Sequence, residues 1–264
     1  MKRILRYKLF YLAAVVGVAV LLLMLAAAHF KLNVITINTL TGTFFGGVFF
    51  TISIIFSGAM TDFKEAEKIP GELAVLLKAM HTDAKLISPQ GKDNLEEIEQ
   101  KDIINHIESL LSTINANLRG NQWHKSQLDE EINKINTDII DLWAKGASPS
   151  PLMKLRDNLT NIDRLSHRID YIAYTADIPG AYLICDLSLA AVLIIFVFAQ
   201  NEWGFGGLLL FALVAFVLTA IVQLIHDIDN PFEYDKNTIA DVDMSVLFKL
   251  ENFWKTGRTN TVVK

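Results

Sequence analysis

The sequence contains one cysteine, Cys185, among its 264 residues. A single thiol cannot form a disulfide within the chain, and no Cys/His spacing of a zinc site is present. Because Cys185 lies in a long apolar run, we interpret it as a small packed residue rather than a reactive group. Neither a disulfide framework nor a zinc site is therefore expected.

The sequence also lacks the short motifs of the common enzyme classes. It has no glycine-rich phosphate loop, no nucleophile elbow and no HExxH pair, and its six histidines are scattered along the chain. We therefore predict that the protein is not an enzyme and uses no cofactor. The net charge is −5 and no basic block stands out, which argues against a nucleic-acid-binding surface.

Apolar residues, by contrast, are plentiful and gather in long runs. Hydrophobic residues make up 52% of the chain and charged residues 20%, a mixture that indicates a membrane part joined to a water-facing part. A helix of about 20 residues crosses a bilayer core roughly 30 Å thick. Four stretches reach this length: residues 9–28, 34–60, 180–199 and 206–225. We therefore predict an all-α integral membrane protein with four transmembrane helices.

The four predicted helices form two hairpins, because the linkers 29–33 and 200–205 are too short for anything but antiparallel neighbours. The first helix follows a basic start, as a signal peptide does. Its apolar run exceeds the roughly 7–15 residues of a signal core, so we expect it to be retained. The predicted organisation is a transmembrane hairpin at 1–61, a helical domain at 62–178, a second transmembrane hairpin at 179–226 and a tail at 227–264.

Basic residues near the ends of these helices predict the orientation of the chain. Four of the first eight residues are Lys or Arg, and the tail and the start of the 62–178 segment are also basic, whereas the two short loops contain only Lys31. Basic residues favour the cytoplasmic side of a membrane. We therefore expect both termini and residues 62–178 to lie in the cytoplasm, below the inner (plasma) membrane.

Residues 62–178 show helical periodicity throughout and no strand alternation. The clearest stripe repeats at alternating steps of four and three: Leu128, Ile132, Ile135, Ile139 and Leu142. Turn chemistry interrupts the helices at 88–91, 119–121 and 146–151. Apolar stripes need a partner face, so these helices pack on one another or on a neighbouring subunit. Because the stripes cover more faces than one short bundle hides, we expect a homo-oligomer.

One face of the second transmembrane helix combines polar and aromatic residues. Steps of three and four place six residues on it: Asn38, Gly42, Phe45, Phe49, Ile52 and Phe56. Around a symmetry axis, this face would line a pore whose aromatic rings gate by dewetting and whose ring edges suit anions. Two other interpretations stay open: the small residues let helices pack closely, or the phenylalanines face lipid.

A carboxylate, Asp186, lies about six residues inside the third transmembrane helix. A charge within the membrane is costly and usually has a partner. His226 and Gln223, near the cytoplasmic end of the fourth helix, lie at a matching depth. We expect Asp186 to be buried and paired with one of them, either as a structural tie or as a proton or ion site.

Four carboxylates follow the last transmembrane helix: Asp227, Asp229, Glu233 and Asp235. The Asn-Pro step among them takes the chain out of helical conformation. The carboxylates either form a turn and cap the next helix, which is the interpretation we favour, or gather a cation such as Ca²⁺, which prefers several oxygen ligands.

This layout resembles the bestrophin-like membrane proteins of bacteria and archaea. The similar segments are residues 62–73, DFKEAEKIPGEL, after the second helix and residues 229–232, DNPF, after the fourth. The resemblance implies a pentameric anion channel whose neck is lined by the second helix. Where the family forms a Ca²⁺ clasp, this chain has the Asn-Pro-Phe segment but no following glycine and no long acidic run.

Two functions therefore follow from the sequence. The first is an oligomeric bestrophin-like ion channel that conducts an inorganic anion such as chloride, with the lipid bilayer and further copies of itself as partners. The alternative is a membrane-anchored scaffold or signalling protein whose cytoplasmic helices bind a partner. A channel requires a continuous path along the symmetry axis, whereas a scaffold requires none.

Overall fold

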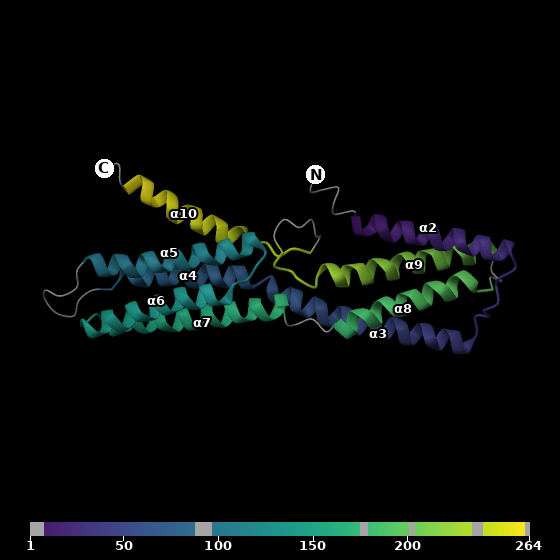
Figure 1. The fold of residues 1–264 in the computed structure, drawn as a ribbon, viewed down its shortest axis with the longest axis horizontal. Coiled ribbons are helices and arrows are strands. Elements are labelled where there is room, and N and C mark those ends of the chain that lie inside the picture. The colour runs from purple at the N-terminus through teal and green to yellow at the C-terminus, as the bar shows by residue number, and fades with distance from the viewer. Residues whose placement is uncertain (1–7, 88–96, 175–178, 201–203, 234–239, 262–264) are drawn as a thin grey trace. The chain divides into compact units, whose positions relative to one another are not determined.

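The computed structural model describes residues 8–87, 97–174, 179–200, 204–233 and 240–261, and it confirms the predicted all-α class (Figure 1). Its helices are α2 (Lys8–His29), α3 (Thr39–Ala66), α4 (Ile69–Lys85), α5 (Glu97–Gly120), α6 (Lys125–Ala144), α7 (Pro149–Tyr174), α8 (Pro179–Phe198), α9 (Gly204–Asp227) and α10 (Ser245–Thr261). The chain divides into two compact units. The membrane unit contains α2, most of α3, α8 and α9, and the bundle unit contains α4 to α7 and α10.

Four apolar helices are long enough to cross a membrane, as the hydropathy predicts. They are Leu9–His29, Gly180–Phe198, Gly204–Asp227 and the apolar first part of the helical stretch Thr39–Lys85. Within the membrane unit, α2, α8 and α9 pack closely against one another. The fourth helix of the unit, α3, joins them through a few large side chains, among which Val48 and Ile52 are buried. Much of the surface of α3 is therefore not covered by other described residues of the chain.

The second membrane helix begins at Thr39 and not at Val34, where the apolar run starts. The preceding segment is extended: the Ile35 N–H donates to the Phe198 carbonyl at 3.0 Å, and the Gln200 N–H donates to the Ile35 carbonyl at 2.8 Å. Asn38 then caps the helix, because its Oδ1 accepts from the Leu40 and Thr41 N–H groups at 3.0 and 3.1 Å. In return Thr41 Oγ1 accepts from the Asn38 N–H at 2.8 Å, which completes a reciprocal cap.

The bundle unit buries the stripes that the sequence predicts. All five residues of the α6 stripe, from Leu128 to Leu142, are at most 7% exposed. In sequence order the helices run α4, α5, α6, α7 with α7 returning to pack against α4, and α10 lies against α4 and α5 (Figure 1). At one end of this bundle, α4 and α6 finish and α5 and α7 begin. We call this end the distal end. There the Gln100 side-chain amide donates to the carbonyls of Ala84, Lys85 and Ile87, which holds the end of α4 beside the start of α5.

A glycine ends α6 where turn chemistry predicts a break. Gly146 has a φ of +83°, which favours glycine because a Cβ would crowd the backbone. Its N–H donates to the Trp143 carbonyl at 3.0 Å, and the Ala147 N–H donates to the Leu142 carbonyl at 3.0 Å. This pair of bonds is the Schellman arrangement that satisfies the last carbonyls of a helix. The predicted break at 119–121 is also found, and the one at 88–91 lies outside the described residues.

Candidate functional site

The face of α3 turned away from the core of the membrane unit is rich in glycine and hydroxyl residues. Its exposed positions include Thr39, Gly42, Thr43, Gly46, Gly47, Ser53, Ser57 and Gly58. A Cβ built on any of the four glycines would meet nothing within 4 Å. Some threonine hydroxyls satisfy themselves by donating one turn back, as Thr43 Oγ1 does to the Thr39 carbonyl at 2.9 Å. Large exposed residues stand among these small ones, and they are Leu40 at 78%, Phe50 at 67%, Ile54 at 56%, Phe44 at 41% and Phe49 at 37%.

The six residues predicted to line a pore straddle the edge of this face. Asn38 and Gly42 are exposed, and Phe49 is 37% exposed. Phe45 and Phe56 are half-buried and pack on the core of the membrane unit, where the rings of Phe45 and Phe196 have centroids 5.3 Å apart.

Ile52 needs a correction, because it is only 2% exposed and belongs to the core of the chain itself. An ion path that runs along the outer surface of the chain therefore does not include Ile52. The reason is a small error in helical phase. The buried side of α3 is centred near Val48 and Ile52, and the periodicity alone did not identify that side.

The structure contains the polar pair that the predicted depth of two residues in the membrane suggests. The pair consists of Asp186 on α8 and His226 at the end of α9. Asp186 Oδ1 and His226 Nε2 are 3.0 Å apart, and the Tyr182 ring lies 5.5 Å from the imidazole. The expectation that Asp186 is buried does not hold for the single chain, because its side chain is 53% exposed. Gln223, one turn before His226, is half-buried. The pair ties α8 to α9 and leaves a polar spot on the surface of the membrane unit.

The acidic segment after α9 forms a turn. Asp227 Oδ2 accepts a hydrogen bond from the Ala240 N–H at 3.2 Å, which holds the segment before α10. Asp229 and Glu233 are half-buried, and Asp235 lies outside the described residues. Within the part of the chain that the structure describes, no three His, Cys, Asp or Glu side chains are grouped closely enough to hold a metal ion. The described residues of this segment therefore form a turn, as the interpretation we favour predicts.

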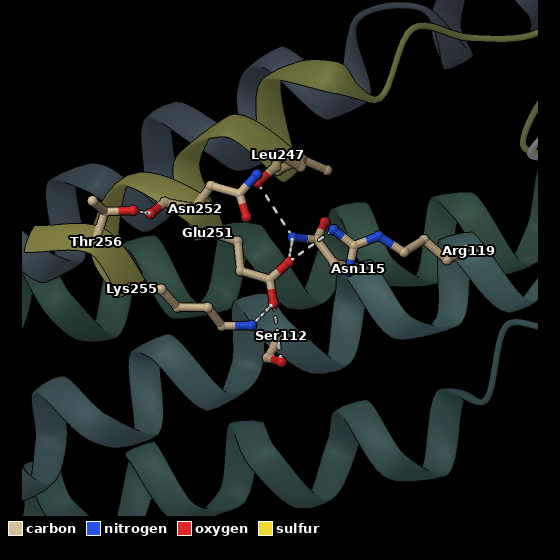
Figure 2. A network of polar contacts seen from close by, with 8 residues as sticks. All are labelled: Ser112, Asn115, Arg119, Leu247, Glu251, Asn252, Lys255 and Thr256. Carbon is tan, nitrogen blue, oxygen red and sulfur yellow. Dashed lines mark hydrogen bonds and ion pairs between the residues drawn. The ribbon is translucent and has the colours of Figure 1, made fainter. Parts of the chain in front are cut away.

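Sequence reasoning missed the docking of α10, which rests on a buried carboxylate (Figure 2). Glu251 is 4% exposed, and it accepts hydrogen bonds from Asn115 Nδ2 at 2.8 Å and Arg119 at 3.1 Å, both on α5. Lys255 on α10 donates to it at 2.5 Å. Burial alone raises the pKa of Glu251, but these hydrogen bonds and the charges of Lys255 and Arg119 outweigh burial, so the pKa lies below its usual value.

Two ring contacts support the same docking. The rings of Trp254 on α10 and His81 on α4 stack with centroids 4.5 Å apart, and the Arg119 guanidinium lies 4.4 Å from the centre of the Phe248 ring. Residues 245–261 show only a weak apolar stripe, and their partners are more than 130 positions earlier in the chain. The only sequence signal for α10 was a modest helical period in the tail.

No protein-family model matches the chain, and no curated protein sequence matches it. Solved structures do match. A crystal structure of a bacterial bestrophin homolog from Klebsiella pneumoniae, a variant, aligns with a TM-score of 0.70 at 11% identity over 93% of this chain and 96% of that one. Another variant from the same organism gives a TM-score of 0.69 at 12% identity over 96% of this chain and 97% of that one. A structure described only as a membrane protein gives 0.69 at 12% identity, over 92% and 96% of the two chains. The resemblance predicted from the sequence is thus confirmed at the level of the fold: this chain has a bestrophin-like fold.

Proposed function

We propose that this protein is an oligomeric ion channel of the bestrophin type, in which α3 of each copy lines the path for ions. The observation that carries the proposal is the chemical contrast between α3 and its neighbours. The exposed residues of α2, α8 and α9 are mostly large and aliphatic, such as Leu22, Ile194 and Val217 at 60, 58 and 50% exposed. The exposed face of α3 is instead mostly glycine and hydroxyl residues. Such a face gains little from lipid and is suited to water or to close helix contact.

The phase of α3 selects the residues of the proposed path. An axis shared by several copies lies outside the core of each copy, so it faces the most exposed side of α3. That side is centred on Gly46, Phe50 and Ser53. It is rotated about the helix axis, by roughly the angle between two consecutive residues, from the face that the sequence periodicity predicts. Phe50 and Ile54 are one turn apart, about 6 Å along the helix, and form a short hydrophobic neck. Phe49, Gly42 and Asn38 lie at the border of the path.

Several finer features of the proposal come from the resemblance and from the residue chemistry. Ring edges of Phe50 carry partial positive charge, so the neck favours an inorganic anion such as chloride. A pentamer is the assembly that the resemblance implies. The bias of Lys and Arg places both termini and the bundle unit in the cytoplasm. The half-exposed Asp186–His226 pair fits a surface that a second copy covers, because lipid tails would leave it in a costly environment.

Planar-bilayer recording tests the channel and its lining together. Phe50→Ala widens the neck, so we expect a higher unitary conductance than that of the wild type. Leu22→Ala, on the exposed aliphatic face of α2, is the matched control and should leave conductance unchanged. A shift of the reversal potential toward the chloride potential in asymmetric chloride would support anion selectivity. If the assembled wild type and Phe50→Ala both pass no current, a membrane-anchored scaffold replaces the channel.

A further inference from the structure

The distal end of the bundle unit carries an apolar pocket on its α6–α7 side. The pocket has a volume of about 60 Å³, and its lining includes Ile140, Trp143 and Met153. These three side chains are 62, 57 and 51% exposed, although the other large apolar residues of α6 are buried. A cluster of exposed apolar side chains around a hollow indicates a surface that another group covers.

The pocket also has a charge at its border. Arg156, one turn after Met153 on α7, contributes to the lining. Within the described residues Arg156 makes no ion pair. Covering a guanidinium without giving it a partner is costly, so a group that covers this pocket should bring a carboxylate to the level of Arg156.

The same chain offers a group with this chemistry at the end of α4. Leu86 follows the last residue of α4 and is 64% exposed. Asp83 lies one turn before it, and its carboxylate makes no ion pair within the described residues. An apolar side chain and a carboxylate are thus three residues apart at the end of α4, as Met153 and Arg156 are on α7, with a rise of about 4.5 Å in each case.

Contacts within the bundle show that the α6–α7 pocket and the pair Leu86 and Asp83 lie at the same height along the bundle. His106 on α5 is paired with Asp138 on α6 at 2.6 Å, and Gln100, about 9 Å further toward the distal end of α5, contacts the end of α4. On α6, the same rise of about 9 Å from Asp138 toward the distal end leads to Ala144. Leu86 is therefore level with Trp143, and Asp83 is level with the more proximal part of the pocket that Arg156 borders.

We propose that the α6–α7 pocket of one copy receives Leu86 of the next copy, with Asp83 of that copy paired with Arg156. This inference rests on the proposed ring of copies. Symmetry gives every copy the same contacts, so where the bundle units of neighbouring copies pack side by side along their length, groups at the same height of the bundle lie opposite each other. The contact is heterologous: each copy contributes the pocket on one side and Leu86 on the other. It repeats around the ring without an unpaired end.

Disulfide cross-linking between two differently tagged copies tests this contact. One copy carries Leu86→Cys and the other carries Met153→Cys, so that a dimer with both tags reports a contact between copies. We expect oxidation of the membranes to shift the monomer band to a dimer that carries both tags. Val75→Cys is the matched control for Leu86→Cys, because Val75 is 68% exposed on the same helix but about 16 Å away along it. That pairing, and the wild type with its buried Cys185, should give no dimer.

Charge exchange provides a second readout. Asp83→Lys should lower the fraction of assembled protein, and adding Arg156→Glu to the same chain should restore it, because the attraction is reversed but retained. No cross-link in protein that mass photometry finds oligomeric overturns this contact and leaves the channel proposal in place. A dimer formed by Leu86→Cys alone indicates a two-fold contact and also overturns it. Cross-linking does not require conduction, so a protein that cross-links but passes no current contradicts only the channel.

Discussion

At the scale of single residues, close packing between α2 and α9 depends on the absence of a side chain at Gly17. A Cβ at this position would lie 3.1 Å from the Ala212 carbonyl oxygen and 3.3 Å from Phe216 Cβ. The nearest atom belongs to the backbone of α9, so it cannot move aside as the end of a flexible side chain does. Small residues at such crossings let helices approach and gain packing energy within the membrane.

We therefore expect Gly17→Val to destabilise the protein by about 1–3 kcal/mol, the usual cost of overpacking. Ala14→Val is the matched control, because Ala14 lies one turn earlier on α2 and is exposed. Thermal unfolding of the two purified variants in the same detergent measures the difference. Equal unfolding temperatures for Gly17→Val and the wild type would show that α2 and α9 do not cross closely at this point.

Glu251 is the other residue on which a whole contact depends. In Glu251→Leu the fully buried Asn115 amide keeps its bond to the Leu247 carbonyl but loses the carboxylate, and a buried N–H left without an acceptor costs about 1–3 kcal/mol. We expect α10 to exchange its amide hydrogens faster in this variant. Replacing Asn115 by Leu as well removes both polar partners and should recover part of the protection. Hydrogen exchange of residues 245–261, with α6 as the internal reference, checks both outcomes.

At the scale of elements, α10 is held to α4 and α5 by groups that respond to acid. The pKa of Glu251 is lowered in the folded state, so its ionisation stabilises docking at every pH above the usual carboxyl range of about 4–5. This contribution is lost as the pH falls through the lowered pKa. We expect protection of α10 to persist from neutral pH to about 5 and to decrease below the usual carboxyl range.

Glu251→Gln separates this effect from general acid unfolding. The variant keeps the shape of the side chain but cannot titrate, so the protection of α10 should no longer change with pH in that window. Hydrogen exchange measured across pH and corrected for the intrinsic rate compares the two proteins. A wild type whose α10 shows the same pH profile as Glu251→Gln would contradict the assignment to Glu251.

The elements also show which features a sequence can predict. Four membrane helices were predictable, because twenty apolar residues in a row are a strong signal. The start of α3 at Thr39 was not, because Val34, Ile35 and Ile37 are apolar and yet precede the helix, in a segment held by a bridge from Ile35 to Ala199. The pairing of Asp186 with His226 followed from depth, since antiparallel helices bring equal depths together. The exposure of that pair, the phase of α3 and the docking of α10 depend on tertiary packing between distant segments, which periodicity does not contain.

At the scale of the whole molecule, the proposed channel requires a fixed orientation in the membrane. If each of the four candidate helices crosses the bilayer once, both termini are expected on one side, together with the bundle unit that lies between the second and third helices in the sequence. The excess of Lys and Arg in these segments predicts that this side is the cytoplasm. The 30–38 connection, which contains exposed Lys31 and Val34, then faces outward.

Cysteine labelling of intact cells decides this orientation. A membrane-impermeant thiol reagent should label Lys31→Cys from outside, and it should label Ser126→Cys, at the start of α6, only after the membrane is opened. The wild type is the control, because its one thiol, Cys185, is fully buried in the core of the membrane unit. Labelling of Ser126→Cys but not Lys31→Cys in intact cells would reverse the topology. The bundle unit would then face outward, and the ring contact through Leu86 would lie outside the cell, while the requirement for α3 to line the path would be unchanged.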